Sequence, residues 1–322
     1  MKRRDVLIGL SMAAALGLAP FTATAAEWPA KPITMICPWS PGGGTDLLLR
    51  KLAASLSKVV KQTVTVVNTT GGGGAIGHAA IMRAKPDGYS IGMITFELNS
   101  LPPQGLIPFT WKDFDPIMRI NMDPPALTVQ KSSPLNNLKD FADYAKANPD
   151  KVTIGNSGPG SVWHIAAAMM ADELGIKAKY VPFDGAAPAV TALVGGHLTA
   201  VSVSVAEVRG QVAGGNLKIL GVMGETRSDL FPEVPTFAEQ GVKATFGTWR
   251  GIGLPKGVPP KVRAKIMTSL KAAFDDADFQ AFAKSAGLSL AYQNDKDFVK
   301  FLDKNANDVE RVMKSLGLAK KK

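Results

Sequence analysis

Residues 38–46 constrain the fold of this chain more than any other stretch, and their sequence is PWSPGGGTD. They separate a short β-type run at 33–37 from a stretch at 47–60 whose apolar residues recur at helical spacing. The pattern predicts a strand, a glycine-rich turn and a helix start, with Thr45 as the N-cap. Because a helix N-terminus attracts anions, we expect this turn to hold a carboxylate. A tight structural turn is the alternative.

The alternation of strands and helices continues along the chain. Strand-like runs at 64–67 and 89–96 alternate with helical runs, which is typical of a parallel sheet with flanking helices. A second unit follows its strand with a glycine-rich loop at 155–161 and a helix at 162–174, and Ser161 is the expected N-cap. Two anion-attracting helix ends in two units predict a cleft between them.

The remaining segments suggest how the two units are connected. Residues 98–125 are rich in proline and turn formers and are expected to be a connection. Residues after about 245 are expected to carry the chain back to the first unit in an extended form. We therefore expect one domain from residues 27–125 together with 248–322, and a second domain from 126–247.

The N-terminus has the features of an export signal. Residues 2–4 are basic, and the apolar run at 6–19 is shorter than the about 20 residues that a membrane-spanning helix needs. Small residues at 23–25 complete a cleavage site, so residues 1–26 are expected to be a cleaved signal peptide, for either the general or the twin-arginine route. The mature chain is expected in the periplasm, with the single cysteine, Cys37, buried in a strand.

The formal net charge of +10 suits an anionic small ligand through diffuse steering. No zinc-binding pattern and no basic run interleaved with aromatic residues supports nucleic acid as a partner. The histidines, His78, His164 and His197, are scattered without metal-ligand spacing, and no P-loop lysine follows a glycine run. We therefore expect no cofactor, no metal and no nucleic acid.

One enzymatic alternative is a dinucleotide site. Gly72, Gly74 and Gly77 match the dinucleotide fingerprint, and Glu97 stands near the position of the ribose-binding acid. Four residues separate the preceding strand from the first glycine, however, whereas the fingerprint turn lies directly at the strand end. An exported protein also has no assured supply of NAD, so a glycine-rich loop at the mouth of the cleft is favoured.

A second enzymatic alternative is a hydrolase, because Ser157 and Ser161 lie close to His164 in the sequence. The nucleophile elbow requires Gly-x-Ser-x-Gly, and this chain has Pro159 and Trp163 where the second glycine would stand. We therefore expect a binding protein with no catalytic residues.

Several separately spaced motifs resemble those of the Bug family, the periplasmic solute-binding proteins of tripartite tricarboxylate transporters. Together they cover essentially all of the mature chain, in the family's order. They comprise 38–46, Asn68 with 72–77, 86–89, Gly158 with Gly160, Ser161 and His164, 181–183 with 185–189, Gly195 with Gly196, Arg227 with 231–236, and 247–251.

The resemblance implies an α/β, two-domain Venus-flytrap fold of the type II periplasmic-binding-protein class, each domain a mostly parallel sheet flanked by helices. It implies a cleft that closes on an organic carboxylate, which the chain, expected to be a monomer, delivers to membrane subunits of the transporter. A ligand-sensing subunit of a signalling system would use the same cleft and is the alternative. The implied ligand-binding positions are Trp39, Ser40, Gly42, Gly43, Gly44, Thr45 and Asp46, then Ser157, Gly160, Ser161 and His164, with Asp184, Gly185 and Ala186 beside them.

The chain departs from the family pattern at two places. Trp39 stands where phenylalanine is common, and Phe96 with Glu97 ends the third strand where small hydroxyl residues are usual. A glutamate at the cleft would repel a second carboxylate unless a cation or an amine paired with it. Either Glu97 sets ligand specificity in this way or its side chain points to solvent.

Overall fold

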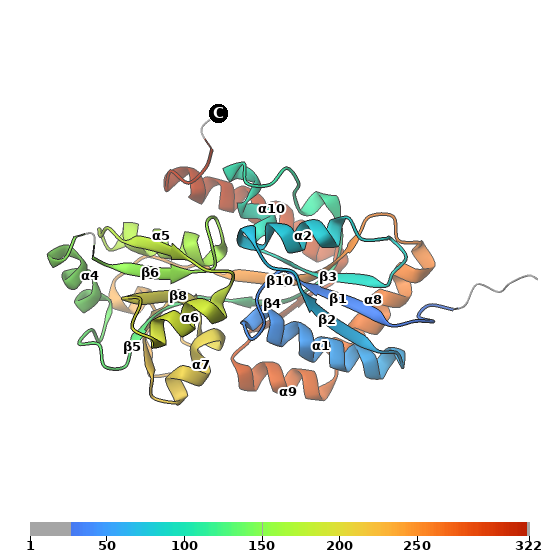
Figure 1. Ribbon diagram of the computed structural model, residues 1–322, viewed down its shortest axis with the longest axis horizontal. Coiled ribbons are helices and arrows are strands. Elements are labelled where there is room, and N and C mark those ends of the chain that lie inside the picture. Colours follow the sequence, from blue (N-terminus) through green and yellow to red (C-terminus); the bar gives the residue numbers. More distant parts are fainter. Residues whose placement is uncertain (1–26, 150, 321–322) are drawn as a thin grey trace, which may run out of the picture.

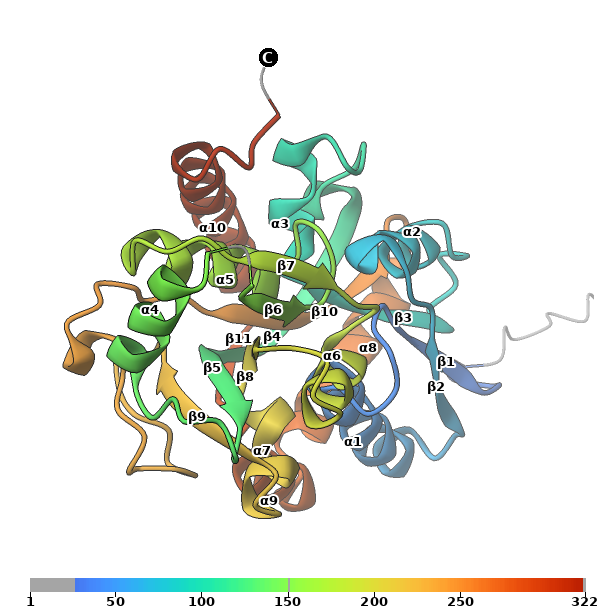
Figure 2. The ribbon, with the colours of Figure 1, turned by 60° about the vertical axis from the view of Figure 1, so that its left-hand side comes forward.

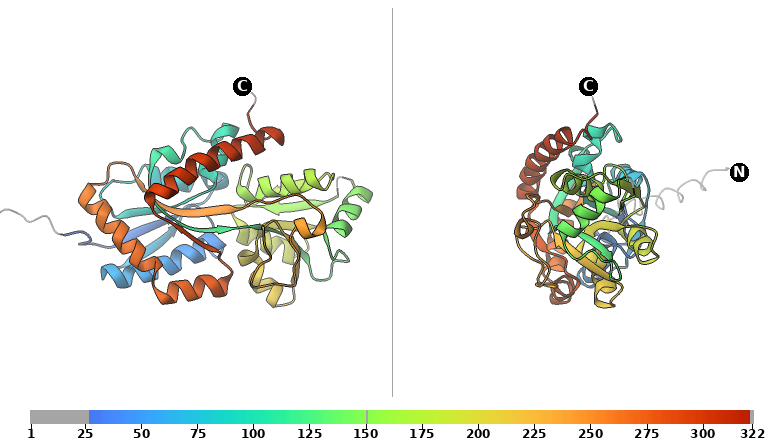
Figure 3. Two further views of the ribbon diagram at one scale, coloured as in Figure 1. Left: turned by 180° about the vertical axis from the view of Figure 1, so that it is seen from behind. Right: turned by 90° about the vertical axis from the view of Figure 1, so that its left-hand side faces the viewer.

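The computed structural model describes residues 27–149 and 151–320; the expected signal peptide at 1–26 lies outside the described residues. Two lobes lie side by side along the long axis of the molecule, and each is built around one sheet flanked by helices (Figure 1). A green segment near residue 125 and an orange segment near residue 250 pass between the lobes, which is clearest from behind (Figure 3). The α/β, two-lobed architecture agrees with the sequence prediction.

The first lobe contains a six-stranded sheet. In sheet order its strands are β11 (Leu290–Gln293), β4 (Phe114–Asp123), β10 (Thr248–Pro255), β3 (Ser90–Thr95), β1 (Ile33–Cys37) and β2 (Val64–Asn68). Strand β1 pairs in parallel with β2 and β3, whereas β10 is antiparallel to both β3 and β4. Helices on this lobe are α1 (Gly44–Val60), α2 (Ala75–Met82), α3 (Glu97–Ser100), α8 (Pro260–Phe274), α9 (Ala277–Ala286) and α10 (Asp295–Ser315).

The second lobe contains a five-stranded sheet. In sheet order its strands are β7 (Lys179–Pro182), β6 (Thr153–Asn156), β8 (Ala200–Ser204), β5 (Pro125–Gln130) and β9 (Leu217–Val222). Strand β6 is parallel to β7 and β8, and β5 is antiparallel to β8 and β9. The helices are α4 (Leu138–Ala147), α5 (Val162–Glu173), α6 (Ala186–Val194) and α7 (Val205–Ala213), seen from another side in Figure 2.

Both sheets are mixed, which corrects the prediction of mostly parallel sheets. The chain leaves the first lobe along β4, enters the second along β5 and returns along β10. Strand β4 runs from the first lobe and β10 runs back into it, so these neighbouring strands are antiparallel. The antiparallel pairing of β4 with β10 therefore follows from the chain leaving the first lobe along one strand and returning along the other.

The segment 98–125, predicted to be a connection rich in turn formers, contains strand β4, which the sequence analysis did not identify. The ten residues of this strand include Pro116, which argues against a strand in a single-sequence analysis because proline lacks the N–H of the ladder. In the structure, Pro116 pairs with Gly253 of β10, whereas β11 reaches β4 only at Arg119 and Asn121. Pro116 therefore lies where β4 has a neighbour on one side.

The core is continuous between the lobes. All residues of β8 and β10 are buried, and one apolar cluster contains Phe96 from the end of β3 together with Val203 of β8 and Trp249 of β10. The Phe96 ring meets Phe246 edge-to-face, with centroids 5.3 Å apart. None of the helices in the described ranges is long and apolar enough to cross a bilayer.

Candidate functional site

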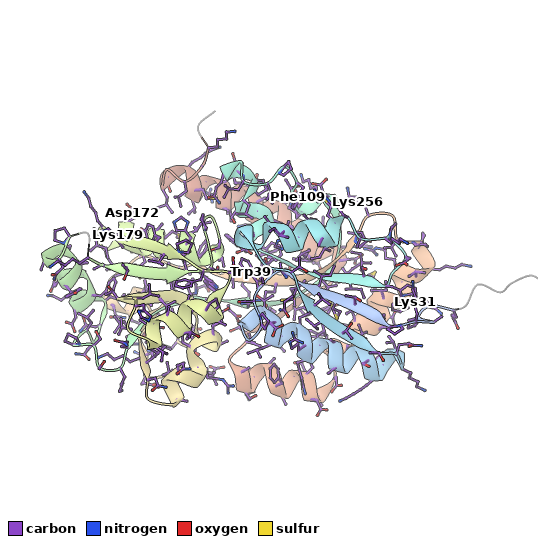
Figure 4. All side chains as sticks on the ribbon, in the orientation of Figure 1. Lys31, Trp39, Phe109, Asp172, Lys179 and Lys256 are labelled. Carbon is purple, nitrogen blue, oxygen red and sulfur yellow. The ribbon has the colours of Figure 1, made fainter. Side chains whose placement is uncertain are left out.

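A small cavity lies between the two sheets and takes its walls from both. It encloses about 20 Å³, enough for about one water molecule. Trp39, one of its lining residues, lies in the middle of the molecule where the lobes meet (Figure 4). The lining residues are Trp39, Ser40, Gly43, Thr45, Thr95, Glu97, Ser157, Val162, Trp163, Ala186, Glu207, Thr248 and Arg250.

The first loop, residues 38–46, presents an uncapped helix end to this cavity. Helix α1 begins at Gly44, and its N-cap is Gly43, with no side-chain capping bond. The prediction that Thr45 is the N-cap was therefore wrong; its hydroxyl instead accepts a hydrogen bond from Arg250 Nε at 2.8 Å. Because the first N–H groups of a helix have no intrahelical acceptor, the start of α1 can donate to an anion.

Asp46 fixes the first loop through hydrogen bonds to its carboxylate. One of its carboxylate oxygens accepts the Gly42 N–H and Arg50 Nε, each at 2.9 Å, and the other accepts Asn68 Nδ2 at 2.8 Å. Burial opposes ionisation of Asp46, but these bonds outweigh it and lower its pKa. Asp46 and the exposed Gly42, with its φ of +81°, position the loop and do not line the cavity.

The second loop, residues 155–161, has a capped helix end. The Ser161 hydroxyl accepts the backbone N–H of His164 at 3.3 Å, which confirms Ser161 as the N-cap of α5. Nδ1 of His164 accepts the Gly160 N–H at 3.1 Å, and burial lowers the pKa of this histidine. Of these predicted binding residues only Ser157 lines the cavity, and its hydroxyl, like that of Ser40, is buried without a hydrogen-bond partner.

Glu97 connects the end of β3 in the first lobe to the helix that follows the second loop. It is the first residue of α3 in the first lobe, and only 1% of it is exposed, so the solvent-facing alternative was wrong. Its Oε1 accepts the N–H of Val162, the first residue of α5 in the second lobe, at 3.0 Å. Its Oε2 accepts the Thr95 hydroxyl. The N-terminus of α5 is therefore occupied by a carboxylate of the protein itself.

Arg250 is a functional candidate that the sequence analysis missed. The β10 register pairs it with Thr95 on one side and Asn121 on the other, so the guanidinium lies at the cavity. Its Nη1 donates to Asp123 at 2.5 Å, and its Nη2 lies 3.6 Å from Glu207 Oε1. A charged residue within the apolar run at 248–255 was the signal that could have identified it.

Two buried acids surround this arginine. Burial raises the pKa of Asp123 and of Glu207, while Arg250 opposes the rise in both. Glu207 also forms a capping box with Ser204, whose N–H it accepts at 2.9 Å. The Ser-x-x-Glu spacing of a capping box could have revealed Glu207 in the sequence.

The other predicted site residues lie around the cavity. Ala186 lines it, whereas Asp184 is exposed and Phe96 packs in the core. A Cβ at Gly185 would lie 2.5 Å from Ser40 Oγ, and one at Gly44 would lie 3.1 Å from Glu207 Cγ. These two glycines therefore allow the lobes to approach each other closely.

The features of the enzymatic alternatives have structural roles. Gly72 and Gly74 lie in a 3-10 turn, and a Cβ at Gly77 would lie 2.5 Å from Pro38 Cα, so Gly77 permits close packing. The hydroxyl of Ser161 accepts the backbone of His164, not its ring. Within residues 27–149 and 151–320, no group of three or more His, Cys, Asp and Glu side chains could hold a metal ion.

Comparisons with known proteins agree with this architecture. Residues 48–318 match TctC, the tripartite tricarboxylate transporter family receptor. A relative from Cupriavidus necator, the "UPF0065 protein in gbd 5'region", is 31% identical over 328 residues, which is 99% of both chains.

The solved structures that are similar to this chain include the following three. The periplasmic binding protein BugD is 30% identical, with a TM-score of 0.87 over 91% of this chain and 100% of that chain. R. palustris Rpa4515, solved with adipate, is 25% identical, with a TM-score of 0.86 over 91% and 99%. A TctC solute-binding protein from Polaromonas, solved with no ligand, is 36% identical, with a TM-score of 0.64 over 89% and 99%. The chain belongs to the tripartite tricarboxylate transporter receptor family and is a periplasmic solute-binding protein of the Bug type.

Proposed function

We propose that this protein captures a small organic carboxylate between the first and second loops and delivers it to membrane subunits of a tripartite tricarboxylate transporter. The observation that carries the proposal is the cavity between the sheets. It combines the uncapped N-terminus of α1 with the unpartnered hydroxyls of Ser40 and Ser157. Such donors suit a carboxylate, because charge-assisted hydrogen bonds are the stronger ones. The relative solved with adipate supports the same ligand class.

Ligand entry requires the lobes to separate, because a cavity of about 20 Å³ is too small for an organic acid. The comparisons support a hinge: the Polaromonas protein, solved with no ligand, is 36% identical and has a TM-score of 0.64, whereas Rpa4515, solved with adipate, is 25% identical and has a TM-score of 0.86. The hinge would lie where β4 and β10 leave the first sheet. The proposed domains are residues 27–125 with 248–322, and 126–247.

Binding and release need no chemistry, so we propose no catalytic residue. Asp46 and Ser161 would position the two loops. The proposed ligand contacts are the predicted residues that also line the cavity: Trp39, Ser40, Gly43, Thr45, Ser157 and Ala186. The chain would be exported by a cleaved signal peptide at 1–26 and act as a monomer. The functional unit would thus be a single chain with one ligand cleft between its lobes.

A thermal-shift screen followed by calorimetry tests the proposal. The mature chain is tested against mono-, di- and tricarboxylates, amino acids and aromatic acids. Ligand at about 100 times its Kd should add about 2.7 kcal/mol of stability. Stabilisation by no carboxylate in this panel would refute the proposal.

A matched pair of glycine variants then places the ligand. Gly44→Val should weaken the best ligand at least about tenfold, about 1.4 kcal/mol, because its Cβ would lie 3.1 Å from Glu207 Cγ and obstruct closure. Gly210→Val is the control, since Gly210 is an exposed residue of α7 with no atom within 4 Å of its Cβ position. Unchanged affinity in the Gly44 variant would remove the first loop from the site.

A further inference from the structure

Glu97 occupies the place where the second loop could otherwise bind an anion. Its carboxylate accepts the Val162 N–H at the start of α5, at 3.0 Å. That helix is twelve residues long, and its other first-turn capping bond is made by Ser161. A second carboxylate of a ligand would therefore meet a carboxylate of the protein at this end of the cavity.

The hydrogen bonds of Glu97 favour its ionised form. Thr95 donates its hydroxyl to one oxygen and Val162 its N–H to the other, so both oxygens act as acceptors. Nε2 of His78 accepts the backbone N–H of Thr95 at 3.2 Å. Nδ1 of His78 lies 2.8 Å from the carbonyl oxygen of Gly74, so the ring proton is on Nδ1 and is donated to that oxygen. Burial raises the pKa of Glu97, so a cation beside it would relieve the cost of its charge.

The cavity walls carry more acidic than basic groups. Glu97 and Glu207 both line the cavity, and among its lining residues Arg250 is the single cation. That cation already bonds Asp123, which lies behind it, and approaches Glu207. Arg250 is thus in contact with Asp123 and Glu207, and its charge also acts on Glu97. His78, which bonds Thr95, is neutral because burial lowers its pKa to about 4.

Two unpartnered hydroxyls add to this charge pattern. Ser40 Oγ in the first lobe and Ser157 Oγ in the second are buried without hydrogen-bond partners, and both residues line the cavity. A buried hydroxyl without a partner is costly and therefore indicates a polar ligand group. These hydroxyls come from both loops. Of the two acids in the cavity walls, Glu207 lies 3.6 Å from Nη2 of Arg250, whereas Glu97 is bonded by the neutral donors Thr95 and Val162.

We propose that the solute bears a protonated amine as well as a carboxylate, with its carboxylate at the start of α1 and its amine facing Glu97. This inference rests on the proposed function and names its ligand class: an amino acid or a similar zwitterion. Glu97 is then the residue that selects this class against dicarboxylates, through charge attraction on one side and repulsion on the other.

Calorimetry on the mature chain with matched ligand pairs tests the inference. The pairs are glutamate with glutarate, aspartate with succinate, γ-aminobutyrate with butyrate and anthranilate with benzoate, and adipate and malate complete the panel. At least one amine-bearing ligand should bind at least about tenfold tighter than its amine-free partner, the range expected for a hydrogen bond to a charged group. Glu97→Gln should reduce that ratio at least about tenfold, because the glutamine carbonyl still accepts the Val162 N–H but carries no charge.

Glu173→Gln is the matched control, because it removes an exposed carboxylate at the C-terminal end of α5, the helix whose N-terminus Glu97 bonds. It should leave every ratio unchanged. Tighter binding of the amine-free partner by the native chain, or a preference that survives in Glu97→Gln, would overturn the inference and leave carboxylate capture standing. If no member of the panel binds, the proposed function fails and the inference with it. The native chain's ratios decide the matter even if the Glu97 variant does not fold.

Discussion

The first and second loops have similar sequences and opposite states. Both follow a strand with glycines and a hydroxyl residue and then start a helix. In the first loop the helix end has no side-chain cap, and Thr45 bonds Arg250 instead. In the second loop Ser161 caps the helix and Glu97 of the other lobe accepts the Val162 N–H.

The difference shows that a glycine-rich helix end becomes a ligand site only if the rest of the protein leaves it free. At the second loop, the partial positive charge of the α5 N-terminus is balanced by the carboxylate of Glu97, which lies about 65 positions earlier in the chain. In the first loop, Asp46 accepts the N–H of Gly42 and Thr45 accepts a hydrogen bond from Arg250. Neither side chain therefore caps the start of α1, and its first N–H groups stay free for a ligand. The two loops therefore contribute differently to the same cavity.

The largest expected effect comes from removing the cation beside the first loop. Arg250→Met should lower the free energy of unfolding by about 3–5 kcal/mol, because it leaves Asp123 and Glu207 buried without their counter-charge. Urea denaturation measures this loss. Lys139→Met, at an exposed ion pair, is the control and should cost less than about 1 kcal/mol. Equal small losses in both would show that Arg250 does not support the site.

The next effect concerns pH and His78, which lies behind Thr95 and Glu97. Burial lowers the pKa of His78 to about 4 from 6.5, so the unfolded chain binds its proton first. Stability from this group is complete above pH 6.5 and is lost as the pH falls towards 4, by about 3 kcal/mol at about 1.4 kcal/mol per pH unit. Urea titrations of the native chain between these pH values should show this loss relative to His78→Gln.

The exposed His197 provides the control for that experiment. His197→Gln removes an exposed histidine and should change the free energy of unfolding at neutral pH by less than about 0.5 kcal/mol. A native profile that matches that of His78→Gln would mean that His78 is charged in the folded protein.

A smaller effect separates capping from ligand contact within the second loop. Ser161→Ala should cost about 1 kcal/mol of stability through loss of the N-cap of α5. Ser157→Ala should leave stability nearly unchanged, because the Ser157 hydroxyl has no partner in the protein, but it should weaken the ligand. Chemical denaturation and calorimetry on both variants measure the two effects. If Ser157→Ala lowered the stability and Ser161→Ala weakened the ligand instead, the two serines would have the opposite roles.

The smallest effect on stability gives the first loop the cap that the second has. Gly43 is the N-cap of α1 with an extended φ of −75° and ψ of 165°, and its Cβ position has only ordinary contacts. Gly43→Ser should therefore stabilise the fold by a few tenths of a kcal/mol, while its hydroxyl competes with the ligand for the N–H groups of α1. Melting curves and calorimetry should show higher stability with weaker binding. Tighter binding would show that the uncapped end is not the ligand contact.

Much of the fold could be predicted because it depends on local patterns. The strand predicted at 64–67 and the Ser161 cap follow from residues close together in the chain. Strand β4 was missed because Pro116 is acceptable only where one neighbouring strand is absent, which the local sequence does not contain. The Thr45 cap was wrong because Arg250, distant in the sequence, takes its hydroxyl.

The sequence by itself determined the family, the alternation of strands and helices, and the glycine-rich loops, since these depend on residue type and spacing. Only the tertiary structure decided which helix end stays free. The antiparallel register of β10 and β3 places Arg250 beside Thr95, and the approach of the lobes brings Glu97 to α5. Charges that meet across the fold, from residues far apart in the chain, have no signature in local periodicity.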